Sequence, residues 1–210
     1  MARRSAPEVN AGSMADIAFL LLIFFLVTTT IEVDSGIASK LPPPLPVNTP
    51  PPLIKEKNIF QVVVNAENRL LVEDKDMEIG KLTDAAVKFL DNGGGTDPRN
   101  VCPYCRGGKD PDSSDNPQKA VISLVNDRQT SYKMYLAVTN ELVRAYSILR
   151  DREAKRLYNE TYQSMTNRFA EWPATEKENN PEYDELDERI NNVQELFPRN
   201  LSEAEPQNRD

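Results

Sequence analysis

The stretch that decides the architecture is residues 16–31, which read Asp16-Ile17-Ala18-Phe19-Leu20-Leu21-Leu22-Ile23-Phe24-Phe25-Leu26-Val27-Thr28-Thr29-Thr30-Ile31. Residues 11–31 contain a single charged side chain, that of Asp16, and residues 17–31 contain none. A helix over residues 11–31 would be about 31 Å long, close to the thickness of the hydrocarbon core of a membrane. The pattern therefore predicts a transmembrane helix at residues 11–31.

The residues that flank this segment indicate its orientation. A cleaved signal peptide is the alternative to a retained anchor, because Arg3 and Arg4 make a basic start. Asp16 argues for the anchor, since the core of a signal peptide is apolar. Glu32 and Asp34 follow the segment, so the positive-inside rule places residues 1–10 in the cytoplasm and the rest of the chain outside.

Asp16 is the most informative residue of the chain. A carboxylate within a membrane helix costs about 2.5–3.5 kcal/mol on insertion scales, and such residues usually face a helix bundle and often carry protons or ions. The alternative is that Asp16 lies near the membrane surface and reaches water, but its side chain is short. The sequence therefore favours a functional role for Asp16 over a position at the membrane surface.

The composition excludes several classes of protein. The chain has 210 residues, a formal net charge of -8, two cysteines and no histidine. Without histidine there is no Ser-His-Asp or Cys-His catalysis, and two cysteines cannot complete a four-ligand zinc site within one chain. No basic surface stands out that would neutralise the phosphates of a nucleic acid. We therefore expect no enzyme, no cofactor, no metal and no nucleic-acid partner.

A proline-rich linker at residues 32–57 separates the predicted anchor from a domain at residues 58–165. Seven of the twelve residues at 41–52 are proline, which favours a stiff polyproline II spacer; a docking strip for a partner is the alternative. Beyond it, β-branched and apolar runs predict strands at 59–64, 69–72 and 120–125. Apolar spacings of three and four predict a helix at 80–90 and a second helix that starts near Tyr135 and continues towards Phe169.

The fold class that follows is a single N-terminal transmembrane helix plus a small α+β domain outside the membrane, in the order β-β-α-β-α. A loop at residues 92–118 interrupts this domain and contains Cys102-Pro103-Tyr104-Cys105. The motif matches that of glutaredoxins, but no helix is predicted to follow it. We therefore favour a local disulfide between Cys102 and Cys105 over thiol catalysis.

Residues 166–210 form an acidic tail with twelve acidic and five basic residues. The tail contains one amphipathic stretch with apolar residues three and four positions apart: Tyr183, Leu186, Ile190, Val193 and Phe197. Two alternatives are open for this stretch. It docks on a partner or on the chain's own domain, or it remains a solvated tail.

Taken together, these motifs resemble the ExbD/TolR family. The resemblance rests on Val9-Asn10, on Asp16 and the apolar run to Val27, and on Leu41-Pro42. In the domain, Asp127 and Tyr132 follow the third predicted strand as they do in the family. The family normally closes its domain with a strand soon after the second helix. That strand is not evident here, which suggests a smaller sheet or one completed by another chain.

The resemblance implies a function. ExbD/TolR proteins are single-span subunits of proton-driven motors in the bacterial inner membrane, with a cytoplasmic N-terminus and a periplasmic domain. Two such chains sit inside a ring of multi-span ExbB-like subunits. Proton flow through the ring is coupled to work on a TonB-like protein, for import across the outer membrane, or alternatively on a Tol-like system, for envelope integrity. Asp16 would carry the proton, and Leu41 and Pro42 would belong to a partner-binding linker.

Two other readings of the function remain open. One is a membrane-anchored thiol oxidoreductase that uses Cys102 and Cys105. The other is a binding module with a passive anchor, in which Asp16 has no role in proton transfer.

Overall fold

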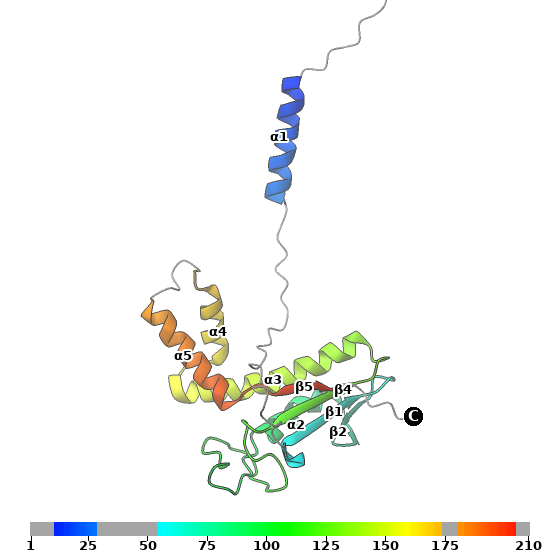
Figure 1. Cartoon of the computed structure of the whole chain (residues 1–210), viewed down its shortest axis with the longest axis vertical. Coiled ribbons are helices and arrows are strands. Elements are labelled where there is room, and N and C mark those ends of the chain that lie inside the picture. The colour runs from blue at the N-terminus through cyan, green and yellow to red at the C-terminus, as the bar shows by residue number, and fades with distance from the viewer. Residues whose placement is uncertain (1–10, 29–53, 174–179, 205–210) are drawn as a thin grey trace, which may run out of the picture. The chain divides into compact units, whose positions relative to one another are not determined.

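A computed structural model describes residues 11–28, 54–173 and 180–204, and the chain divides into two compact units, Met1–Pro50 and Pro51–Asp210 (Figure 1). Several predictions fall outside the described residues. These are the cytoplasmic segment 1–10, the last three residues of the predicted span, most of the linker, and both Leu41 and Pro42.

The first unit contains helix α1, Ala11–Thr28. Its large apolar side chains, which occur from Met14 to Val27, are all at least 43% exposed. The helix has 18 residues, which correspond to about 27 Å, less than the roughly 30 Å of a hydrocarbon core. In the part of the chain that the structure describes, no helix combines the length and apolarity needed for a membrane crossing. The described helix is thus shorter than the predicted one.

The second unit is built on a five-stranded mixed sheet with the order β3-β2-β1-β4-β5. Its strands are β1 (Ile59–Val64), β2 (Leu70–Val72), β3 (Lys75–Asp76), β4 (Val121–Asn126) and β5 (Leu201–Ala204). The central strand β1 pairs antiparallel with β2 and parallel with β4, and β5 adds to β4 in parallel. Alternation of buried and exposed residues along β1 gives the sheet one core face.

Two helices pack against each other on the core face of this sheet, α2 (Leu82–Leu90) and α3 (Tyr132–Tyr158) (Figure 1). Two short 3-10 turns, η1 (Glu56–Asn58) and η2 (Ile79–Lys81), precede β1 and α2. The Ser131 side chain caps the start of α3 by accepting a hydrogen bond from the Met134 amide. The core joins apolar residues of the sheet and both helices, among them Val62, Ile122, Leu124, Leu82, Leu142 and Leu149.

Beyond α3 the chain forms a helical insertion of two further helices, α4 (Tyr162–Glu171) and α5 (Pro181–Leu196). The break between α3 and α4 occurs at Asn159, which adopts the left-handed conformation that ends many helices. Both helices contact α3 and each other, as Figure 1 shows. They share a second apolar cluster with α3, formed by Ala154, Met165, Leu186, Ile190 and Val193.

This insertion decides between the two alternatives for the C-terminal tail. Within residues 180–204, Leu186, Ile190, Val193 and Phe197 are buried against the chain's own domain. After α5 the chain returns to the sheet, where Leu201 pairs with Ile122. The expectation of a smaller sheet, or of one completed by another chain, was therefore wrong. A further strand, β5, closes the sheet after α4 and α5.

Candidate functional site

Asp16 lies in the second turn of α1 and is the only charged residue of that helix. Gly12 lies one turn before it, and Phe19 and Leu20 lie one turn after it on the same side of the helix. A carboxylate surrounded by small and apolar residues has no counter-charge on its own helix. Asp16 is thus the one ionisable group of a helix whose large apolar side chains are exposed.

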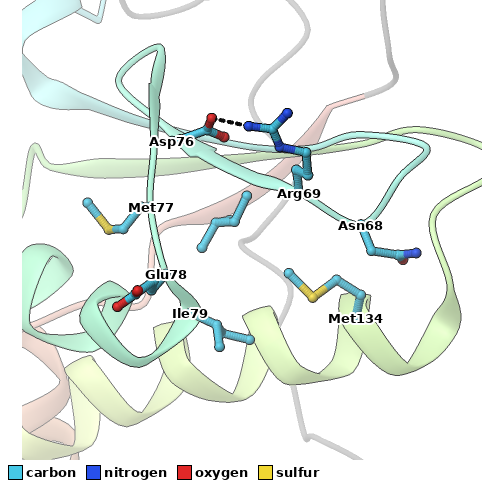
Figure 2. Close-up of a pocket in the computed structure, with 8 residues that line it drawn as sticks. Asn68, Arg69, Asp76, Met77, Glu78, Ile79 and Met134 are labelled. Carbon is cyan, nitrogen blue, oxygen red and sulfur yellow. Dashed lines mark hydrogen bonds and ion pairs between the residues drawn. The ribbon is translucent and has the colours of Figure 1, made fainter.

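The second unit has a groove between the β2–β3 hairpin and the start of α3, with a volume of about 510 Å³ (Figure 2). Its apolar lining comes from Leu70, Met77, Ile79 and Met134. Polar residues form the rim: Asn68, Arg69, Asp76 and Glu78. An ion pair between Arg69 and Asp76 closes one side of the rim. Methionine side chains are flexible and adapt to different apolar partners, so the groove is suited to receiving an apolar side chain of another segment.

Hydrogen bonds between Asn68 and Ser131 connect the two sides of the groove. Asn68 adopts a positive φ of 60° in the turn before β2. Its Oδ1 accepts hydrogen bonds from the amide and the hydroxyl of Ser131, at 2.9 and 2.7 Å. Because Ser131 caps α3, these hydrogen bonds fix the hairpin relative to the first turn of the helix, where Met134 lies.

Cys102 and Cys105 form a disulfide, with their Cα atoms 5.5 Å apart. Both residues are buried, at 5% and 8% exposed. Residues 91–120 contain no helix or strand, so the helix that follows the cysteines in glutaredoxin-type sites is absent from this loop. The geometry describes a packed structural disulfide and not an accessible thiol site.

Two groups of ion pairs fasten the disulfide loop to the rest of the domain. At its start, Asp91 accepts two hydrogen bonds from the Arg152 guanidinium, at 2.6 and 2.8 Å. Near its end, buried Asp115 pairs with Lys57 at 2.5 Å and accepts a hydrogen bond from Asn58. Burial alone would raise the Asp115 pKa, but the hydrogen bonds from Lys57 and Asn58 outweigh it, so the pKa is lowered.

Tyr104, between the two cysteines, reaches the C-terminal part of the chain. Its hydroxyl donates a hydrogen bond of 2.8 Å to the Leu196 carbonyl. Burial raises the pKa of Tyr104 to about 12, and the carboxylates of Glu153 and Asp91 add to the shift. The phenol therefore stays protonated, and can donate this bond, throughout the physiological pH range.

The residues singled out in the sequence fall in separate parts of the chain. Asp16 belongs to the first unit, the cysteine pair belongs to the second, and Leu41 and Pro42 lie outside the described residues. The groove was missed, because Leu70 and Met134 are far apart in the sequence and no motif marks them. Among the described residues, no group of three or more acidic, cysteine or histidine side chains could hold a metal ion.

The site and the fold define a class of protein in which one apolar helix carries a lone carboxylate and precedes a small α+β domain. The chain belongs to the ExbD/TolR family, whose members are described as biopolymer transport proteins, and the family's pattern matches residues 2–149. The match ends within α3, so α4, α5 and β5 lie beyond it. Comparison with individual curated proteins gave no significant match.

Proposed function

We propose that this chain is the ExbD-like subunit of a proton-driven motor in the bacterial inner membrane. Residues 11–31 span the membrane once, with the N-terminus in the cytoplasm and residues 58–204 in the periplasm. Asp16 takes up a proton on one side of a surrounding ring and releases it on the other. The chain itself performs no chemical catalysis.

The observation that carries this proposal is the lone Asp16 in a helix whose large apolar side chains are all exposed. A helix that is apolar on every side is covered by lipid or by other protein. A carboxylate within it is costly in lipid, and is therefore expected to face other helices. Membership of the ExbD/TolR family supports the same assignment.

The partners follow from this arrangement. An ExbB-like ring of multi-span subunits covers α1 and encloses a pair of these chains. In the periplasm the domain passes the work to a TonB-like protein, and a TolR-like role in envelope integrity is the alternative. The linker with Leu41 and Pro42 gives the domain reach, and the groove lined by Met77 and Met134 offers an apolar contact for an extended segment of the periplasmic partner.

Asp16→Asn tests the proposal, because it keeps the size of the side chain but removes the titrating proton. Energised uptake, or envelope integrity, is measured in cells, and complex assembly is checked by co-purification with the ring protein. We expect assembly to survive and energised function to vanish, since no residue from 17 to 31 can ionise in place of Asp16. Asp16→Glu retains the carboxyl group and is expected to retain a small part of the activity.

The matched control is Asp34→Asn, the same chemical change at a carboxylate that follows the apolar segment. It is expected to leave function unchanged. An assembled Asp16→Asn complex that works at the normal rate would contradict the proton-carrier assignment. Equal losses in Asp16→Asn and Asp34→Asn would show that the loss is not specific to the site within α1.

A further inference from the structure

The disulfide loop contacts the junction between α5 and β5 at two separate points. Near its middle, Tyr104 donates its hydroxyl to the Leu196 carbonyl at 2.8 Å. At its end, the Asn200 side chain donates to the carbonyl of Gln118 at 3.2 Å, and the Gln118 side chain donates to the carbonyl of Glu195 at 3.4 Å. The loop therefore touches the chain on both sides of residue 197, where α5 ends and the return to the sheet begins.

Phe197 is the centre of this junction. Its side chain is completely buried, and the Tyr104 ring meets it edge to face with the ring centroids 5.5 Å apart. The Arg152 guanidinium lies over the same ring at 5.7 Å. Arg150 donates two hydrogen bonds to the Phe197 carbonyl, at 2.9 and 2.8 Å. Of these three residues that contact Phe197, Tyr104 alone belongs to the disulfide loop.

The disulfide sets the position of Tyr104. Tyr104 lies inside the four-residue ring closed by Cys102 and Cys105, so its backbone has little freedom while the bond is intact. The ring packs tightly on the base of the loop, because a Cβ atom added to Gly93 would lie 2.7 Å from Cys105 Cβ. Reduction removes the ring closure and with it the constraint on the Tyr104 side chain.

Strand β5, which follows this junction, has few other contacts with the domain. β5 has four residues, lies at the edge of the sheet, and pairs with β4 alone. Ser202, Glu203 and Ala204 are exposed. Tyr135 on α3 donates a hydrogen bond to Glu203, and Leu201 is the one side chain of β5 that packs, half-buried, against the core. The fixed end at Phe197 therefore determines how firmly β5 stays paired.

We propose that the Cys102–Cys105 disulfide is an oxidation-dependent clasp for the C-terminal part of the domain. When the bond forms, Tyr104 is held against Phe197, and β5 stays paired with β4. Its formation converts two thiols to a disulfide with loss of two protons and two electrons, which a disulfide-bearing thiol oxidant accepts as it becomes a dithiol. Because both cysteines are buried, reversal by a dithiol is slow, and the clasp acts as a one-way step in folding. This role is independent of proton transfer by Asp16.

The test is amide hydrogen exchange of the full-length chain in detergent, followed in peptides that cover β5 and, as an internal reference, β1. Cys102→Ser/Cys105→Ser is expected to speed exchange in residues 201–204 about tenfold or more, given the ring pair and the hydrogen bond that are lost. Exchange in β1 is expected to remain unchanged. Tyr104→Ala, with the disulfide intact, is expected to reproduce the increase in β5.

Tyr104→Phe refines the assignment, because it keeps the ring and removes only the hydroxyl. It is expected to give a smaller increase in β5 exchange than Tyr104→Ala. Arg99→Ala is the matched control within the loop, since the Arg99 side chain is exposed and its ion pair is with Asp97 in the same loop. It is expected to leave β5 unchanged.

Three results would overturn the clasp. The first is unchanged β5 exchange in Cys102→Ser/Cys105→Ser. The second is an equal increase in β1 and β5, which would make the disulfide a general support of the domain. The third is protected β5 in Tyr104→Ala, which would remove Tyr104 as the residue that transmits the constraint.

Discussion

Helix α1 exposes its large apolar side chains, whereas the second unit, Pro51–Asp210, buries most of those that the structure describes. From Met14 to Val27 all the large apolar side chains of α1 are exposed. In the folded unit, apolar side chains form two clusters, one between the sheet and α2 and α3, and one among α3, α4 and α5. Buried charges there are paired, as in the contacts of Arg152 with Asp91 and Glu153.

This difference shows where each part obtains its stability. The folded unit has its own core and is expected to fold without help, while the large apolar side chains of α1 are exposed and are expected to need lipid or another protein. Changes in α1 should therefore affect assembly or function but leave the domain intact. Changes in the core of the domain should do the reverse. The predictions below test this separation, starting with the largest expected effect.

The largest effect is expected when the ring protein is missing. Expressed without its multi-span partner, the full-length chain should aggregate or be degraded, because the apolar surface and the carboxylate of α1 are left without protein contacts. We expect its steady-state level to fall several-fold and to recover on co-expression, as measured by quantitative immunoblotting. A chain limited to residues 51–210 is the control and should be abundant in both cases. Abundant, monodisperse full-length protein from single expression would contradict the expectation that α1 needs a protein partner.

A core substitution should act on the folded unit alone. Leu142→Ala on α3 removes a fully buried side chain from the main core and is expected to lower the free energy of unfolding by about 2–5 kcal/mol. Denaturant unfolding of residues 51–210 measures this change. Leu157→Ala, on the same helix but at a side chain that is 38% exposed, should cost much less. Equal losses for the two variants would argue against the described packing of α3.

A smaller effect is expected from the pH dependence of the disulfide loop. The Asp115 pKa is lowered in the folded chain by Lys57 and Asn58. A carboxyl group with a lowered pKa stabilises the fold above its unfolded-state pKa, and the contribution is lost as the pH falls through the folded-state pKa. Stability should therefore decrease as the pH falls below about 4 through this pair.

The measurement compares the free energy of unfolding between pH 3 and pH 6 for residues 51–210 and for Lys57→Met in the same unit. The variant is expected to show a shallower decrease, because Asp115 has lost its closest cation. Lys81→Met is the control, since Lys81 pairs with the exposed Glu78 and should leave the profile unchanged. Identical profiles for the original unit and Lys57→Met would rule out this pair as the source of the pH dependence.

Local patterns in the sequence predicted most of the helices and strands in the part of the chain that the family's pattern matches. The runs of β-branched residues at 59–64 and 120–125 gave β1 and β4, and the apolar spacing of three and four gave α2 and α3. β3 was not predicted, because it has only two residues and both are charged. β5 was not predicted either, because its residues lack a strand-like apolar alternation and its pairing depends on residues some eighty positions earlier.

The candidate site was predictable only where a single residue type is unusual in its surroundings. Asp16 is unusual because it interrupts an apolar helix, and the cysteine pair is unusual because the chain has two cysteines, three positions apart. The groove and the contact of Tyr104 with Phe197 join segments far apart in the sequence. Such contacts leave no periodic signal, and they follow from the tertiary fold alone.

Proton transfer by Asp16 is tested most directly by proton flux through the purified complex of this chain with its ring protein, reconstituted in lipid vesicles that hold a pH gradient. We expect the original complex to dissipate the gradient and Asp16→Asn to reduce the flux to the level of empty vesicles, with unchanged subunit composition. Asp16→Glu should lie between the two. A flux through the intact Asp16→Asn complex equal to that of the original would contradict the assignment of Asp16 as the proton carrier.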